Sequence, residues 1–238
     1  FVGNRTVYAS LFRSVPKALF ESKVRDIYLR AVKEIGDVPV TVRNDGDVSA
    51  LAGAMNLGRN NLLAVTMGTS EAGGYIDSSG GLTGWLNELA TVPVDLNPQS
   101  NSDDLSGDVG CGSRYFSQEA VIRLAPAAGI RLMESLSPAE KLREVQLLLA
   151  EGHNGARRIY ESIGAFLGHS LAYYYELYGC GTVLLMGRVV SGTGGEIALE
   201  KASEVLAGEY PEIAEKLSVI LPDEASRRVG QSVAAASL

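Results

Sequence analysis

A short apolar run at 62–67 places the strongest constraint on the fold of this chain. It leads into a glycine-bearing turn at 68–74 and then into a second apolar stretch that starts at 75–76. A run of this length, bounded by turn residues, is typical of a buried strand rather than a helix. Strands joined by so short a turn must be antiparallel neighbours, so the sequence predicts a β-hairpin.

Helical and strand-like patterns alternate on both sides of this hairpin. A helix is predicted at 17–35, a half-buried strand at 38–42, and a helix from Asp47, its expected N-cap, with Val48, Leu51, Ala52 and Met55 inward. The long segment 77–114 reads as loops with a weak strand near 92–95. Further helices are predicted near 117–125, 138–150, 154–178, 194–207 and 223–236, and strands at 182–186 and 217–221. This order predicts an α/β fold with a mixed sheet.

Composition narrows the classes of function. The 238 residues, 46% hydrophobic, can form one large domain or a small domain with part of another. A net charge of −7 argues against nucleic-acid binding through this segment, and no apolar run reaches membrane-spanning length. With only two cysteines and two histidines, the chain has few ligands for a zinc site. The composition is that of a cytoplasmic protein. Because the chain begins at Phe1 without a targeting pattern, we interpret it as a fragment.

Asp45 is the first candidate for chemistry. It stands where the strand predicted at 38–42 gives way to the next helix. Ligands of open α/β sheets gather at such strand ends, where a carboxylate can take a proton from an attacking hydroxyl. Local sequence by itself slightly favours a second interpretation, in which Asp45 only caps the helix.

The glycine turn at 68–74 is the second candidate. Glycines let backbone N–H groups approach phosphate oxygens, and Thr69 and Ser70 add hydroxyl donors. No Lys-Ser/Thr pair follows, so this is not a Walker-type loop. The alternative interpretation is an ordinary hairpin turn.

Gly187 is the third candidate. It follows the strand predicted at 182–186, and GTGGE at 192–196 opens the next helix. A glycine at this corner can let a flat base lie against the backbone, although simple strand-to-helix turn chemistry explains it as well.

Five blocks carry a family resemblance in their order and spacing. They are VRNDGDVSALAGA, LLAVTMGTSEAGGYI, GLTGWLNELATVPVD, GCGSRYFSQEAVIRLA and TVLLMGRVVSGTGGE. Over about 38–238 the chain resembles the ROK family of sugar kinases and sugar-responsive repressors. The resemblance implies an actin-like (RNase H-like) ATPase domain, a mixed sheet flanked by helices. It also implies that 1–43 is a remnant of the N-terminal lobe and that 44–238 is the C-terminal lobe with a closing helix.

The resemblance also implies roles for individual residues. Asp45 matches the catalytic base, and sugar contacts fall on Asn44, Glu88 and Gln118. ATP and Mg²⁺ are the implied cofactors. The phosphate-binding and adenosine-side positions fall on Gly68, Thr69, Ser70, Gly73, Gly74 and Gly187.

The zinc motif of the family is not retained. Ala90 and Thr91 stand where the family has a glycine and a histidine that binds both sugar and zinc. The cysteine-rich loop is reduced to Cys111, with Tyr115 and Phe116 at its later positions. We therefore expect no zinc and an altered sugar contact.

Other departures fall on the sugar and nucleotide positions. Gln118 replaces a sugar-binding glutamate and can bind a hydroxyl only without charge assistance. Ser70 and Ala72 replace hairpin glycines, and Arg188 follows Gly187 in place of a second glycine. The family's first phosphate loop, an Asp-Gly-Gly-Thr type turn, does not occur in this sequence.

Three hypotheses of function follow. The first is an ATP-dependent sugar kinase, and the second is a catalytically silent sugar-binding or transcription-regulatory protein of the same type. The third, an actin-like assembly protein, has no need for Asn44, Asp45 and Glu88 together. The expected partner is a small-molecule sugar of unspecified identity, and a homodimer is plausible. Trp85, three residues before Glu88, either stacks on a sugar ring or packs internally.

Overall fold

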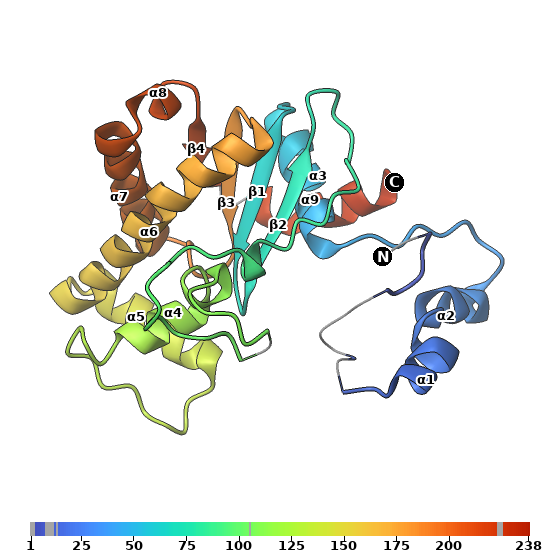
Figure 1. Cartoon of the computed structure of the whole chain (residues 1–238), viewed down its shortest axis with the longest axis horizontal. Helices are drawn as coiled ribbons and strands as arrows, with labels where there is room; N and C mark the ends of the chain where they lie inside the picture. Colours follow the sequence, from blue (N-terminus) through green and yellow to red (C-terminus); the bar gives the residue numbers. More distant parts are fainter. Residues whose placement is uncertain (1–2, 8–11, 13, 105, 223–225) are drawn as a thin grey trace.

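The computed structural model describes residues 3–7, 12, 14–104, 106–222 and 226–238. A four-stranded sheet with the order β2-β1-β3-β4 forms its centre (Figure 1). β1 (Leu62–Met67) pairs antiparallel with β2 (Glu71–Ile76) and parallel with β3 (Thr182–Met186). β3 in turn pairs parallel with β4 (Ser218–Ile220). The predicted hairpin and the mixed sheet are therefore confirmed.

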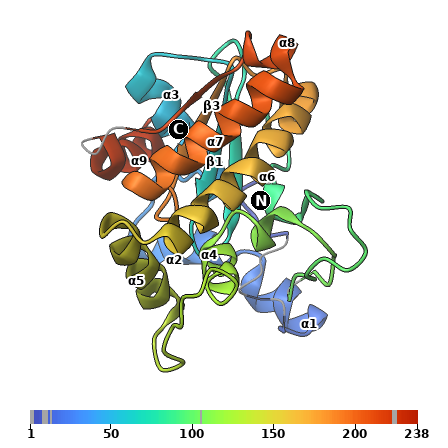
Figure 2. The ribbon, with the colours of Figure 1, turned by 90° about the vertical axis from the view of Figure 1, so that its left-hand side faces the viewer.

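Helices cover both faces of this sheet, as Figures 1 and 2 show. On one face α6 (Asn154–Tyr178) packs against α7 (Thr193–Glu209), and on the other α3 (Asp45–Leu57) packs against α9 (Ser226–Ala236). Alternate residues of β1 serve the two faces: Leu63 and Val65 join the larger core, and Leu62 and Ala64 the smaller one. This alternation follows from the two-residue period of a strand. The α/β layering predicted from the sequence is confirmed.

The remaining helices complete the α6 side. α4 (Gln118–Leu124) and α5 (Pro138–Ala150) pack together, and the short α8 (Pro211–Ala214) follows α7. α5 starts with a capping box, in which Ser137 and Glu140 satisfy each other's backbone amides. The predicted start of the closing helix at 223–225 lies outside the described residues. Among the residues that the structure describes, no helix is long and apolar enough to cross a membrane.

The N-terminal segment departs from its prediction. The single helix predicted at 17–35 is broken into α1 (Lys17–Leu19), a π-helical turn (Phe20–Val24) and α2 (Ile27–Ile35). Both helices stand apart from the main body in Figure 1, and α2 buries none of its residues. None of the residues that α2 contributes to the predicted apolar face is therefore fully buried.

The strand predicted at 38–42 pairs with no described strand. Its backbone is held by one side chain: Asn4 Nδ2 donates to the Val40 carbonyl at 2.9 Å, and Asn4 Oδ1 accepts from the Val42 amide at 2.9 Å. A strand needs a neighbour with which to share its hydrogen bonds. The strand prediction is therefore wrong for this structure.

Two details of α3 also differ from prediction. Its N-cap is Asn44, not Asp47, because Asn44 Oδ1 accepts from the Gly46 amide. Its buried face uses small residues such as Ala50 and Ala54, whereas Met55 is 48% exposed. Small residues face the sheet because α3 approaches the backbone of β2 too closely for a larger side chain.

In the loop region, the weak strand predicted near 92–95 is reduced to one bridge between Pro93 and Cys111. Two short 3₁₀ helices form instead, η3 (Leu89–Thr91) and η4 (Gly112–Arg114).

Candidate functional site

The start of α3 presents an exposed carboxylate. Asn44 Oδ1 accepts from the Gly46 amide at 2.8 Å and fills the N-cap role. Asp45, the first helical residue, has an exposed side chain whose Oδ1 lies 3.0 Å from the same amide nitrogen. The capping function considered for Asp45 thus belongs to its neighbour. A carboxylate in the first turn is also favoured by the helix dipole.

Two backbone contacts bring this helix start onto the hairpin. A Cβ added at Gly46 would collide with the carbonyl oxygen of Gly73, and one added at Gly74 would collide with that of Gly46. Glycine at these positions lets α3 rest directly on β2. Asp45 is thereby held beside the middle of the second hairpin strand.

The hairpin turn itself consists of Gly68, Thr69 and Ser70. Thr69 and Ser70 are exposed, and the Gly68 amide donates to the Ser70 carbonyl at 2.9 Å. The Gly68 carbonyl accepts from the Gln118 amide at 2.8 Å, which ties the turn to α4. Gly73 and Gly74, predicted within the turn, are instead buried residues of β2. Their lack of a side chain is explained by close packing.

Gln118 points into the protein. It is 5% exposed, and its Oε1 is buried without a hydrogen-bond partner. The structure therefore places the backbone of Gln118 at the hairpin turn. Its side-chain amide is buried, whereas the side chains of Asp45 and Glu88 are exposed to solvent.

Glu71 is a buried acid that sequence reasoning did not identify. It is 4% exposed, and its Oε1 accepts from the Tyr174 hydroxyl at 3.4 Å. Oε2 has no hydrogen-bond partner, and Gly112 packs against it so closely that a Cβ there would collide. Burial raises the pKa of Glu71 to about 8. The turn predicted over GTSEAGG hides this residue, which the structure places at the start of β2.

Glu88 lies on the loop that runs beside β2. Its side chain is exposed directly before η3. The preceding Asn87 connects two elements: its Nδ2 donates to Asp47 Oδ1 at 3.3 Å, and its Oδ1 accepts from the Tyr178 hydroxyl at 3.1 Å. Partial burial raises the pKa of Asp47. Asn87 thus fixes the loop that carries Glu88 to the first turn of α3, two residues from Asp45.

Gly187 lies across the end of β1. Its φ is 100°, and a Cβ would collide with the carbonyl oxygen of Met67. The Val189 amide donates to that same carbonyl at 3.1 Å. A glycine is required here by both the left-handed backbone and the close approach.

A cavity of about 520 Å³ opens beside Gly187, between α3, the sheet and α9. Its wall includes Thr66, whose Oγ1 is buried without a hydrogen-bond partner. Predominantly apolar cavities of this size with a few polar groups are typical of small-molecule sites. The other lining residues are Ser49, Ala52, Gly53, Asn56, Leu57, Leu184, Met186, Arg188, Ser191, Leu221, Pro222, Gly230 and Gln231.

Cys111 and Tyr115, which match the zinc loop of ROK proteins in the sequence, take part in hydrogen bonds. Cys111 is buried, with Sγ 3.3 Å from the Ser113 hydroxyl, which donates to Asp103 at 2.8 Å. The Tyr115 hydroxyl donates to Asp95 at 2.5 Å. Within the described ranges, no three His, Cys, Asp or Glu side chains form a group that could hold a metal ion.

The site therefore combines an exposed acid, a turn with free hydroxyls and a nearby cavity. The structure brings Asn44, Asp45 and the Glu88 loop together at the start of α3. The hairpin turn lies at one end of β2, and Gly187 lines the cavity on the α3 side of the sheet. Such an arrangement can accept a proton from a hydroxyl and bind an anionic group nearby.

Comparison with known proteins supports this description of the fold. No protein-family model matches the sequence, and no curated protein matches it. Among solved structures, a ROK hexokinase from Thermus thermophilus is similar with a TM-score of 0.69 and 24% identity, over 90% of this chain and 69% of that one. A ROK family glucokinase from Streptomyces griseus, in complex with glucose and AMPPNP, has a TM-score of 0.68 and 19% identity, over 87% of this chain and 70% of that one.

A regulator has a similar fold as well. A ROK family transcriptional regulator, a homolog of the E. coli MLC protein, gives a TM-score of 0.69 and 17% identity, over 87% of this chain and 54% of that one. These likenesses show that the chain has the α/β, actin-like fold that such kinases and regulators share. The fold predicted from the sequence is confirmed.

Proposed function

We propose that this chain, whose fold is that of the ROK-family proteins, is a ROK-type protein that acts in ATP-dependent transfer of a phosphoryl group to a sugar hydroxyl. The observation that carries the proposal is the position of Asp45. Its carboxylate is exposed at the start of α3, the adjacent Asn44 already caps the helix, and the hairpin backbone lies directly beneath.

In this proposal Asp45 is the general base. It accepts the proton of the sugar hydroxyl as the hydroxyl oxygen attacks the γ-phosphorus of ATP, and ADP leaves with the electron pair of the broken P–O bond. Glu88 and Asn44 hold the sugar. The Asn87 contacts with Asp47 and Tyr178 support this role, because they restrain the loop that carries Glu88.

The residues present fit a nucleotide. Thr69 and Ser70 offer exposed hydroxyls at the hairpin turn for phosphate oxygens, and the cavity beside Gly187 has the volume of a site for a small organic group. The unpartnered hydroxyl of Thr66 gives this cavity a polar anchor. Mg²⁺, when bound with ATP, would neutralise the charge of the phosphates.

Phosphorylation of a sugar panel tests the proposal. The full-length protein and its Asp45→Asn variant are each incubated with ATP, Mg²⁺ and single sugars, and ADP release is measured. We expect Asp45→Asn to lose at least about 100-fold in rate, because general-base catalysis contributes that much or more. Equal, sugar-dependent rates of ADP release in the two proteins would remove Asp45 from the role of base.

A specific observation favours a second candidate, a catalytically silent sugar-binding regulator. Gln118 is turned inward with an unpartnered oxygen, and the TM-score of 0.69 to a transcriptional regulator equals that to the hexokinase. Calorimetry separates the two candidates. Sugar binding without ATP binding supports the regulator, whereas binding of both supports the kinase.

A further inference from the structure

Trp85 forms an aromatic surface on the loop that carries Glu88. Its ring stacks on Tyr75 with centroids 5.6 Å apart and planes inclined by 15°, and it also contacts Tyr178 at 6.1 Å. Despite these contacts Trp85 is 54% exposed. One face of the indole is therefore covered and the rest of the ring remains open.

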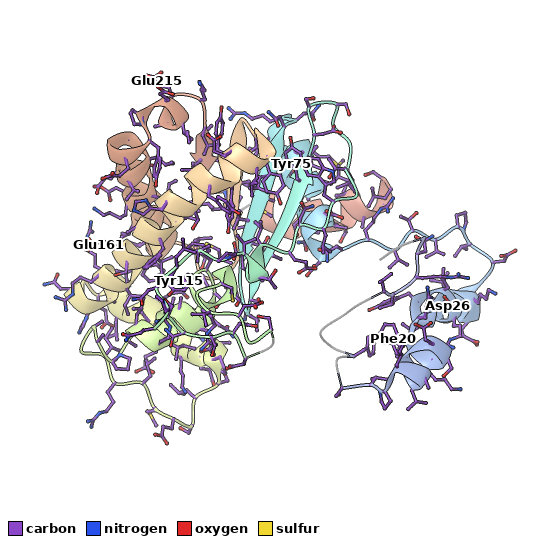
Figure 3. All side chains as sticks on the ribbon, in the orientation of Figure 1. Phe20, Asp26, Tyr75, Tyr115, Glu161 and Glu215 are labelled. Carbon is purple, nitrogen blue, oxygen red and sulfur yellow. The ribbon has the colours of Figure 1, made fainter. Side chains whose placement is uncertain are left out.

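The support beneath the indole is itself fixed. Tyr75 is buried, and its hydroxyl lies 2.7 Å from Asn61 Oδ1 and 3.2 Å from the Tyr178 carbonyl oxygen. Tyr75 lies near the end of β2 that is farther from the hairpin turn (Figure 3). An indole held on so well-anchored a ring loses little conformational freedom when a ligand stacks on it.

The order of contacts along β2 shows where Trp85 lies relative to the hairpin turn and to the loop that carries Glu88. The turn at Ser70 begins the strand, Gly73 packs against Asn87 and Leu89, and Tyr75 supports Trp85. Two residues along a strand span about 7 Å. Trp85 therefore lies further along β2 than Asn87, the neighbour of Glu88, on the side away from the hairpin turn.

The loop exposes apolar side chains at both Trp85 and Leu86. Leu86, the next residue, is 86% exposed, so the loop presents two adjacent apolar side chains. These two side chains offer an apolar contact surface beside the polar residues of the loop. The C–H face of a pyranose ring is the complementary chemistry, because it is apolar while the ring edge carries hydroxyls.

We infer that Trp85 is a specificity-determining residue that stacks on the second ring of a disaccharide or other glycoside. The inference rests on the proposed function, since it takes the ring contacted by Glu88 as the acceptor of the phosphoryl group. It adds a class of substrate: sugars that extend beyond a single ring toward Trp85.

The chain offers a direct probe, because Trp85 is its only tryptophan. Fluorescence is recorded while the chain is titrated with glucose, methyl glucoside, maltose and cellobiose, without ATP, and affinity is measured in parallel by calorimetry. We expect at least one disaccharide to shift the emission saturably and to bind about tenfold more tightly than glucose. Binding of disaccharides without any change in emission, or no binding by any of the four sugars, would overturn the inference.

Three variants separate stacking from packing. Trp85→Ala should lose the tenfold preference for the disaccharide, whereas Trp85→Phe, which keeps an aromatic face, should retain most of it. Met133→Ala, at an exposed apolar residue outside the candidate site, should change neither affinity. An unchanged preference in Trp85→Ala would contradict the inference. Because these readouts require no phosphoryl transfer, failure of the kinase assay leaves them interpretable, and an active kinase with no role for Trp85 would refute only this inference.

Discussion

Gly46 and Gly74 pack backbone against backbone, so that a Cβ on Gly74 would collide with the carbonyl oxygen of Gly46. This contact joins the helix that carries Asp45 to the hairpin that would hold phosphate. It also makes the geometry of the site depend on the absence of two side chains.

Gly74→Ala should destabilise the protein. The new methyl group has no space between β2 and α3, and overpacking of this kind costs about 1–3 kcal/mol in free energy of unfolding. Urea denaturation followed by circular dichroism measures the change. Gly208→Ala is the matched control, because a Cβ at Gly208 meets no atom within 4 Å and the residue lies in α7. It should leave stability unchanged or raise it by up to about 1 kcal/mol.

Asn44 and Asp45 should differ in their contribution to stability. Asn44→Ala removes the N-cap of α3 and should lower the free energy of unfolding by about 1 kcal/mol. Asp45→Asn keeps the shape of the side chain and should change stability by no more than about 0.5 kcal/mol, since it loses only an exposed charge near the helix dipole. Thermal unfolding of both variants checks the pair. A larger loss in Asp45→Asn than in Asn44→Ala would show that the cap was misassigned.

Glu71 should make stability depend on pH. Its pKa is raised from 4.5 to about 8 in the folded state, so between these values the folded protein holds a proton that the unfolded chain has released. Stability from this group is therefore present below about pH 4.5 and is lost as the pH rises toward 8, at roughly 1.4 kcal/mol per unit.

The variant Glu71→Gln tests this dependence, because a neutral side chain cannot ionise. Melting temperatures measured from pH 5 to 8 should fall less steeply with pH than those of the wild type. Glu134→Gln, at an exposed position, serves as the control and should follow the wild-type curve. Parallel curves for the wild type and Glu71→Gln would contradict the assignment.

Asn87→Ala should loosen the loop that carries Glu88. The substitution removes hydrogen bonds of 3.3 Å to Asp47 and 3.1 Å to Tyr178. If Glu88 contacts sugar, we expect sugar affinity by calorimetry to fall about tenfold, the equivalent of roughly one buried hydrogen bond. ATP affinity should stay the same. Asn60→Ala, which removes one 3.4 Å contact to Ser78 at the surface, should leave sugar affinity unchanged.

Local pattern accounts for much of the fold. The apolar runs of β1 and β3, the hairpin between β1 and β2, and the long helix α6 were all predicted to within a few residues. Each is encoded by periodicity over a short stretch. The strand predicted at 38–42 failed for a complementary reason: a strand depends on a partner elsewhere in the chain.

The candidate site could be predicted only in part. The sequence placed Asp45 at the start of a helix and Thr69 and Ser70 at a turn, and both positions are observed. It did not indicate that Glu71 would be buried or that Gln118 would face inward, because the burial of a polar side chain depends on what packs over it. For Glu71 the covering groups are Gly112 and Tyr174, which lie far along the chain.

By itself, then, the sequence determined which segments become helices and strands, because hydrophobic period and turn chemistry act over neighbouring residues. It also determined the chemical groups available at Asp45, Glu88 and Trp85. Only the tertiary structure decided which of these groups meet. The close approach of Gly46 to Gly74 sets Asp45 on the hairpin, and the stack of Trp85 on Tyr75 leaves an indole face open beside it. Such contacts join residues distant in sequence, so they depend on packing that no local pattern encodes.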